Sequence, residues 1–236
     1  CETLAPSDRQ PIAWKRANPF SSLHMFLESR TTVMLGFVML FGLTSQNGST
    51  ALVSLYVQKF ANVDATIVGL LQTTSLGGSV AGLVIFMPML VRCLSLPKIM
   101  VLSCLNGVVC WFLMATADAV WQLFAASAGL VLTALFFPVI RCGMTNTFGR
   151  SRYGESLAAV GVLEQVCATV GPSIVNAVYH STQTSRWEVG GITVRCMALV
   201  AGAFLYLMAA VSGLLVQSIP QDSEDPADRA KEALLG

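Results

Sequence analysis

Residues 31–58, TTVMLGFVMLFGLTSQNGSTALVSLYVQ, contain no charged side chain along 28 positions. A helix needs about 20 mainly apolar residues to cross the roughly 30 Å hydrocarbon layer of a bilayer. The stretch is long enough for this, so it predicts a membrane-spanning helix. Its middle, residues 44–54, is rich in hydroxyl and amide side chains, and lipid offers the amides no hydrogen-bond partner.

Five further stretches of the same character follow along the chain. Four are free of charge and one contains a single acid, Glu164; they are 65–91, 99–117, 119–140, about 153–179 and 196–221. Strands of a membrane β-barrel would alternate in polarity over about ten residues, and no such alternation is present. The sequence therefore predicts an all-α fold, a polytopic membrane protein with six transmembrane helices, in which short links make neighbouring helices antiparallel.

The composition excludes several classes of protein. Of 236 residues, 54% are hydrophobic and 11% charged, against about 25% charged in a soluble domain. Fourteen basic and thirteen acidic residues leave no charge excess that would attract nucleic acid. The seven cysteines form no Cys-x-x-Cys pair, so no disulfide frame, metal site or cofactor is expected. Motifs for a catalytic nucleophile, a catalytic metal or a bound phosphate are absent, so we do not expect an enzyme.

Three regions are expected: an arm over residues 1–30, the six-helix bundle over 31–219, and an acidic solvated tail over 220–236. In the arm, Asn18-Pro19 predicts the start of a short helix that lies at the membrane surface. This helix would place Phe20, Leu23 and Leu27 on one face. The first residue is Cys1 rather than Met, which predicts that further sequence precedes it.

The Lys and Arg residues are unevenly divided between the two sides of the membrane. Eleven lie in the arm, the second and fourth links and the tail, whereas three lie in the other links. Basic residues concentrate in cytoplasmic segments, so both termini are predicted to face the cytoplasm or the equivalent organellar compartment. The pattern does not specify which membrane holds the protein.

Glu164 is expected deep within the fifth span. A helix that starts near Gly154 places its carboxyl group about 15 Å below the surface. A charge at that depth costs a few kcal/mol, so the group must be neutral, paired or in a wet cavity. Two interpretations stay open: Glu164 is a proton or cation site, or it is a protonated group that hydrogen-bonds a neighbouring helix for packing alone.

Amide side chains mark a second candidate site. Gln46 and Asn47 lie in the first span, and Gln72, beside Thr73, lies at similar depth in the second. Because lipid cannot satisfy an amide, these groups should face a partner helix or a cavity. We expect Gln46, Asn47, Gln72 and Thr73 to line a cavity and contact a small molecule. The alternative for Gln72, as for Asn106 and Asn176, is an interhelical tie.

Prolines and small residues predict where helices bend and pack. Pro138 and Gly171-Pro172 interrupt helix hydrogen bonding, either as hinges or as static kinks. Arg141 follows the fourth span and is expected to extend to the interface as an anchor. Small-residue ridges predict close helix packing; they are Thr74/Gly78/Gly82, Gly154/Ala158/Gly161 and Gly202/Ala209/Gly213.

The run WKRANPF at residues 14–20, followed by a first span, resembles the central-loop exit of the major facilitator superfamily. The likeness is to its tetracycline-efflux and hippocampus-abundant-transcript-like branch, where Phe137-Pro138, Gly154 and Gly171-Pro172 recur at the same separations. It covers nearly the whole chain and implies that the six spans are the C-terminal half of a twelve-helix transporter. In that family, spans one, two, four and five of each half line the central pathway.

The chain also departs from that family. Only Arg92 and Lys98 remain of its loop signature, and relatives hold an acid where this chain has Gln46 and a base where it has Glu164. The resemblance implies a secondary transporter, with antiport as its mode, that moves a small organic or drug-like solute by alternating access and couples to protons. The alternative is a non-transporting structural subunit of a larger membrane complex. Either role requires a partner such as a second six-helix bundle, because the polar flank would otherwise face lipid.

Overall fold

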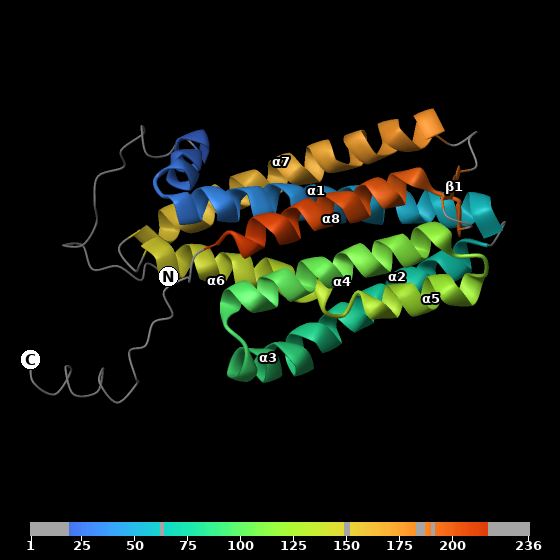
Figure 1. Ribbon diagram of the computed structural model, residues 1–236, viewed down its shortest axis with the longest axis horizontal. Coiled ribbons are helices and arrows are strands. Elements are labelled where there is room, and N and C mark those ends of the chain that lie inside the picture. The colour runs from blue at the N-terminus through green and yellow to red at the C-terminus, as the bar shows by residue number, and fades with distance from the viewer. Residues whose placement is uncertain (1–18, 62–63, 149–151, 183–186, 190–191, 217–236) are drawn as a thin grey trace, which may run out of the picture.

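The computed structural model describes residues 19–61, 64–148, 152–182, 187–189 and 192–216. Its helices run side by side along one axis (Figure 1). In chain order the elements are η2 (Pro19–Leu27), α1 (Arg30–Ala61), α2 (Ala65–Ala81), η3 (Gly82–Phe86), α3 (Met87–Cys93), α4 (Leu96–Thr116), α5 (Val120–Gly129), η4 (Thr133–Leu135), α6 (Phe136–Phe148), α7 (Tyr153–Thr182), β1 (Trp187–Val189), β2 (Ile192–Val194) and α8 (Met197–Leu214).

Five rods in the described part of the chain are long and apolar enough to cross a membrane. They are Ala65–Cys93, Leu96–Thr116, Val120–Phe148, Tyr153–Thr182 and Met197–Leu214. The chain is thus a helical, multi-pass membrane protein, as the sequence predicts. The sixth rod, α1, has 32 residues but is less apolar, because the polar run TSQNGST occupies its middle at residues 44–50. Its role as a sixth span belongs to the function proposed below.

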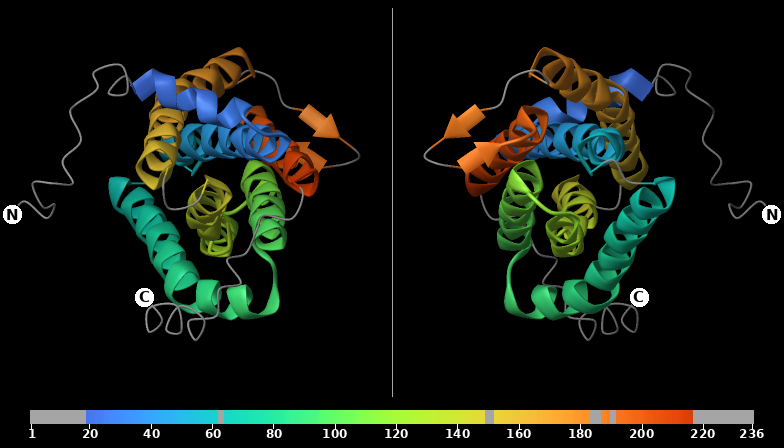
Figure 2. Two further views of the ribbon diagram at one scale, coloured as in Figure 1. Left: turned by 90° about the vertical axis from the view of Figure 1, so that its left-hand side faces the viewer. Right: turned by 90° about the vertical axis from the view of Figure 1, so that its right-hand side faces the viewer.

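The rods form three tiers when viewed from either end (Figure 2). The first tier contains α7, α1 and α8; the second contains α4 and the α5–α6 rod; the α2–α3 rod lies on the outside. Close helix contacts hold the first tier together, since Ser45 on α1 donates a hydrogen bond to the Gly202 carbonyl of α8 (2.7 Å). On the other side of α1, a Cβ added at Gly171 of α7 would lie 2.7 Å from the Thr44 carbonyl. Gly171 therefore serves close packing inside an unbroken α7.

Two rods contain irregular backbone, and the irregular segments lie against each other. In the second rod, η3 is a π-helical turn just before Pro88, whose ring leaves a carbonyl of the preceding turn without its N–H partner. In the fourth rod, α5 ends at Gly129 and helix resumes through η4 into α6, where Pro138 lies in the first turn. A Cβ added at Gly82 would collide with the Val131 carbonyl, so only glycine permits this approach.

An amide on α4 satisfies the broken segment of the fourth rod. The Asn106 side chain donates hydrogen bonds to the Gly129 carbonyl and to the Thr133 hydroxyl, both at 2.9 Å. Asn106 is therefore an interhelical tie. The irregular segment is held by a side chain from another helix, as expected for non-helical backbone at membrane depth.

The structure differs from the sequence predictions at one helix end, at one small-residue ridge and in one link. The fourth rod continues to Phe148 instead of ending at Ile140, so Arg141 lies within α6 and not after its end. Its use as an interfacial anchor stays a prediction. The ridge of Gly154, Ala158 and Gly161 does not pack within this chain, since a Cβ at either glycine would meet no atom within 4 Å. The link before α8 contains a short antiparallel hairpin, in which Trp187 pairs with Val194.

Ion pairs tie the links at each end of the bundle. At one end, Arg195 donates to Asp118 (2.6 Å), joining the segment before α8 to the link between α4 and α5. At the other end, Arg152 binds Glu28 through two hydrogen bonds of 2.6 and 2.7 Å, and also contacts Glu155. The Arg152 pairs place the starts of α1 and α7 at the same end, so these two helices run parallel. They are the first and fifth rods along the chain, which is the result expected when each rod is antiparallel to the next.

The short helix of the arm is present but packs differently from the prediction. In η2, Met25 and Phe26 are buried and η2 contacts α1 and α7, whereas Leu27 is exposed. The predicted face of Phe20, Leu23 and Leu27 is therefore wrong in its use of Leu27. Residues 1–18 and the predicted tail at 220–236 lie outside the described residues.

Substituting Gly171→Ala tests the contact between α1 and α7. The added methyl group meets the Thr44 carbonyl, so we expect a loss of about 1–3 kcal/mol in the free energy of unfolding. Thermal unfolding of the purified full-length protein in detergent measures this. The control is Gly78→Ala in α2, where the added methyl group would lie at an ordinary contact distance, 3.5 Å from the Ala128 carbonyl, and should be neutral or stabilising. Equal effects of the two substitutions would contradict the packing described.

Lowering the pH tests the Glu28–Arg152 pair. Hydrogen bonding to Arg152 lowers the pKa of Glu28 below its usual 4.5. A carboxyl group with a lowered pKa stabilises the folded state above its unfolded pKa, and this contribution is lost as the pH falls through the folded pKa. The melting temperature of wild-type protein should therefore approach that of Glu28→Gln below pH 4.5. A difference between the two proteins that does not change between pH 7 and pH 3 would contradict this.

Candidate functional site

The fourth and fifth predicted spans meet in an ion pair. Arg141 on α6 donates from Nη2 to Oε2 of Glu164 on α7, at 3.1 Å. Glu164 lies eleven residues into α7, about 16 Å along the helix from Tyr153, and Arg141 is seven residues from the end of α6. Of the three states that the sequence left open for Glu164, this geometry corresponds to the paired one.

The pair is partly open rather than sealed in the core. The Arg141 side chain is 46% exposed and the Glu164 side chain 32%. The guanidinium carbon lies 4.1 Å from the centre of the Phe137 ring, one helical turn before Arg141 on α6. This cation–π contact orients the guanidinium. In the end-on views, α6 lies between the α2–α3 rod and α7 (Figure 2).

Only one of the five N–H groups of Arg141 is engaged by Glu164. The other side of the guanidinium has no hydrogen-bond acceptor within the described ranges. Such a group at membrane depth requires water, a partner or a bound anion. The uncommitted N–H groups of Arg141 can donate to a further acceptor.

No other charge lies beside the pair among the described residues. The helices that pack on α6 and α7 are α1, α4, α8 and η2, with η4 beside α6. Their charged or basic residues lie near helix ends and are Arg30 and Lys59 on α1, Lys98 on α4, and His24 on η2 with Glu28 after it; α8 and η4 have none. On α7 itself, Glu155 and His180 lie near the two ends. The Arg141–Glu164 pair therefore sets the local charge.

The predicted amides form a separate polar region between α1, α2 and α4. Gln46 lines a small cavity of about 40 Å³, together with the hydroxyl residues Thr50, Ser75, Ser79 and Thr133. Gln72 lines an adjacent cavity of about 30 Å³ that shares Thr50 and Ser75. The structure thus brings Gln46 and Gln72 to one polar seam, although Gln72 also donates to Ser54 (2.8 Å) as an interhelical tie.

Two aromatic residues of this seam were missed by the sequence analysis. Trp111 on α4 and Tyr206 on α8 line the cavity beside Gln46. Both are buried, and neither the indole N–H nor the phenol hydroxyl has a hydrogen-bond partner in the described part of the chain. A cavity of this size admits a water molecule or a small polar group. The two residues lie in mainly apolar helices, where the sequence alone predicts that an aromatic side chain packs in the core.

Asn47 and Thr73 are not part of the seam. Asn47 is half-buried on α1 and lines neither cavity, and Thr73 is exposed on α2 and donates to the Gly69 carbonyl of its own helix (2.9 Å). A hydroxyl bonded to its own backbone carries little information on function. Their predicted place beside Gln46 and Gln72 is therefore not supported by the geometry.

The ion pair and the amide seam lie at different levels of the bundle. Helices α1 and α7 run parallel, with Cys167 beside Leu40 and Gly171 beside Thr44. In this register Glu164 is level with Phe37, so Gln46 lies nine residues further along, or about 13 Å. One small molecule does not bridge the two directly.

The exposed face of α7 adds a group that the sequence analysis did not consider. Gln165, Thr169 and Ser173 are exposed and lie four residues apart on one stripe. The two hydroxyls donate to carbonyls of their own helix, that of Thr169 to the Gln165 carbonyl (2.9 Å), whereas the Gln165 side-chain amide has no hydrogen-bond partner among the described residues. Beside this stripe α7 also exposes Val166, Val170 and Ile174, whereas the exposed large side chains of α8 are all apolar, namely Phe204, Leu207, Met208, Val211 and Leu214, and suit lipid.

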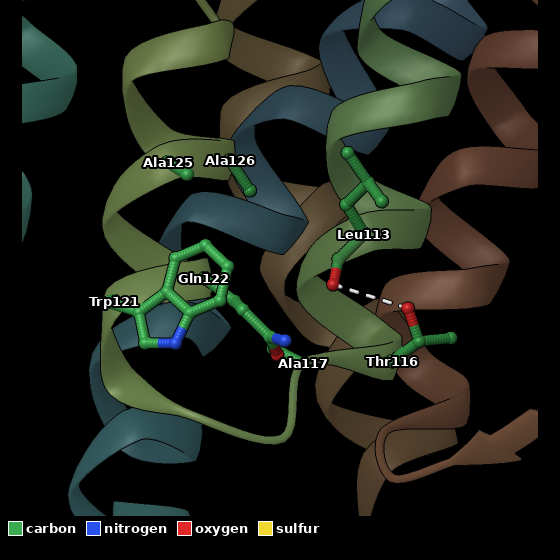
Figure 3. Close-up of a pocket in the computed structure, with 7 residues that line it drawn as sticks. All are labelled: Leu113, Thr116, Ala117, Trp121, Gln122, Ala125 and Ala126. Atoms are coloured by element: carbon green, nitrogen blue, oxygen red, sulfur yellow. Dashed lines mark hydrogen bonds between the residues drawn. The ribbon is translucent and has the colours of Figure 1, made fainter.

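A larger pocket at the α4–α5 link does not involve these groups. It has a volume of about 350 Å³ and is lined by Leu113, Thr116, Ala117, Trp121, Gln122, Ala125 and Ala126 (Figure 3). The side-chain amide oxygen of Gln122 is already used, since it accepts from the backbone N–H of Asp118 (2.6 Å) just before the start of α5. The exposed Trp121 suits a membrane–water interface.

Comparisons with known proteins do not assign the chain to a family. No protein-family model matches it, and no curated protein matches it. The described residues contain no group of three or more His, Cys, Asp or Glu side chains that could hold a metal ion.

A double-mutant cycle tests the coupling of Arg141 and Glu164. Arg141→Gln and Glu164→Gln each leave one unpaired charge within the bundle, whereas the double variant removes both. We expect each single substitution to lower the melting temperature of the full-length protein more than the double substitution does. The coupling should amount to about 0.5–3 kcal/mol. Additive effects would show that the two groups do not interact.

Proposed function

We propose that this chain is the six-helix half of a secondary transporter that moves a small organic solute by alternating access. A second six-helix bundle would cover its polar side. The observation that carries the proposal is the half-exposed Arg141–Glu164 pair within two helices that are otherwise long and apolar enough to span a membrane. Lipid cannot solvate such a pair, but an aqueous pathway between two bundles can.

The uneven burial of the rods supports a partner on one side. In the most apolar 18-residue window of the Ala65–Cys93 rod, only 6% of the residues are buried, against 50% for Leu96–Thr116. A Cβ added at Gly69 or Gly77 on α2, or at Gly154 or Gly161 on α7, would have no atom within 4 Å. Small-residue faces of this kind suit close packing with further helices. We propose that the partner bundle packs on the faces of α2 and α7 that this chain leaves open.

The proposal assigns roles to the residues of the site. Arg141 and Glu164 line the pathway, with Glu164 as the proton-accepting group, and Gln46 and Gln72 border it at another level. The break before Pro138, held by Asn106, is the place where the fourth span would bend; the same role for Gly171-Pro172 stays a prediction. With α1 as a sixth span, both termini lie on the cytoplasmic or equivalent side, in keeping with the Lys and Arg distribution.

A structural subunit that does not transport is the second candidate. The small-residue faces of α2 and α7 are consistent with it too, because they suit permanent packing as well as a moving interface. The two candidates differ in whether water reaches the exposed stripe of α7.

Cysteine accessibility separates the two. Thr169→Cys and Leu207→Cys, on the exposed faces of α7 and α8, are each introduced into the full-length protein with the exposed Cys93 replaced by Ser. A charged, membrane-impermeant thiol reagent should modify Thr169→Cys, because the transporter has a wet pathway there. The same reagent should not modify Leu207→Cys, which faces lipid. Protection of both cysteines would favour the structural subunit.

A further inference from the structure

The Arg141–Glu164 pair restricts the charge of the solute, an inference that rests on the proposed transport function. We propose that the solute is an organic anion, such as a carboxylate or sulfonate, and that it crosses together with one proton.

The pair can be neutral or positive but not negative. An arginine guanidinium keeps its proton at all physiological pH values. The Glu164 carboxyl group can gain or lose a proton, so the pair carries a charge of zero when it is ionised and a charge of plus one when it is protonated. No other charged residue lies beside the pair among the described residues, so these two states set the charge that this bundle brings to the site.

A positive or neutral site selects against cationic solutes. A cation would have to approach Glu164 beside the fixed positive charge of Arg141, which lies 3.1 Å away and is oriented by Phe137. An anion meets the opposite situation, because protonation of Glu164 leaves the guanidinium without its counter-ion. Charge-assisted pairs of arginine with carboxylate or sulfonate oxygens are among the stronger hydrogen bonds in proteins.

The geometry leaves room for this exchange. Glu164 accepts from Nη2 alone, so a bidentate anion can use the other N–H groups of Arg141. With an exposed fraction of 46%, Arg141 is the more open member of the pair, as a group that receives a solute must be.

The transport step balances in charge and in protons. A proton from water binds the Glu164 carboxylate and forms an O–H bond, and the ion pair to Arg141 breaks. The anion then accepts hydrogen bonds from Arg141, so the loaded site carries no net charge. On the opposite side the anion leaves, Glu164 returns its proton to water, and the ion pair forms again. One anion and one proton move in the same direction, which is symport rather than the antiport implied by the sequence resemblance.

Three probes of matched size test the charge assignment: benzenesulfonate, benzenesulfonamide and benzyltrimethylammonium. The full-length protein is reconstituted in liposomes with an acidic exterior, and the initial uptake of each probe is measured together with the internal pH. Benzenesulfonate stays ionised, so a proton that enters with it is carried by the protein. We expect uptake of benzenesulfonate with acidification of the interior, and an accumulation that rises about tenfold per unit of pH difference.

Variants test separately whether Arg141 binds the anion and whether Glu164 carries the proton. Arg141→Gln should reduce benzenesulfonate uptake by about tenfold to a hundredfold, as expected for loss of a charge-assisted contact. Glu164→Gln resembles the protonated site, so it should retain benzenesulfonate exchange across the membrane but move no proton. The double variant, which removes both charges and keeps the shape, should lose uptake. Glu155→Gln, at the surface of the same helix, is the matched control and should behave as wild type.

The outcomes separate this inference from the proposed function. Uptake of the cation or the neutral amide in place of benzenesulfonate would overturn the charge assignment and leave transport intact. Uptake of benzenesulfonate without a proton, or proton movement that persists in Glu164→Gln, would overturn the coupling. A correctly folded wild-type protein that moves none of the three probes would contradict both the anion assignment and, for small organic solutes, transport itself.

Discussion

The absence of water from the hydrocarbon interior of a bilayer is the constraint on which this structure depends. Every backbone group in a span must find its partner within the helix, and every polar side chain must find one in another helix or in a wet space. Most of the chain meets this demand in the simplest way, with long unbroken helices. The exceptions include the π-helical turn before Pro88, the break of the fourth rod that Asn106 holds, the buried polar atoms of Trp111 and Tyr206, and the Arg141–Glu164 pair.

The contact between Arg141 and Glu164 joins two helices of the bundle, so stability and the proposed function depend on the same ion pair. An ion pair in a partly open position contributes little to stability by itself, because desolvation offsets much of the attraction. Its value lies in the two charge states that a single proton can exchange. The amide seam of Gln46 and Gln72, about 13 Å away along the bundle, is uncharged and cannot provide such a switch. The two regions are therefore expected to have different roles in one pathway.

Much of the fold follows from the sequence because charge-free stretches have few alternatives to membrane helices. Five of the predicted spans meet the length and hydropathy expected of a membrane helix, and α1 has the expected position. The fourth span was predicted too short because Arg141 was treated as its end. Its partner, Glu164, is 23 residues away on another helix. A hydrophobic pattern does not determine how one helix is rotated relative to another. For the same reason the sequence grouped Thr73 with Gln46 and Gln72, although only the two glutamines line the seam, and gave no signal for Trp111 or Tyr206 beside them. Contact of these residues with a solute stays a prediction.

The central claim is that the face of α6 and α7 bearing Arg141 and Glu164 is turned toward a second bundle and not toward lipid. A cryo-electron microscopy map of the full-length protein in lipid nanodiscs tests this most directly. The account predicts protein density opposite Arg141 and Glu164, separated from them by a water-accessible space. Acyl-chain density in direct contact with the pair would contradict it.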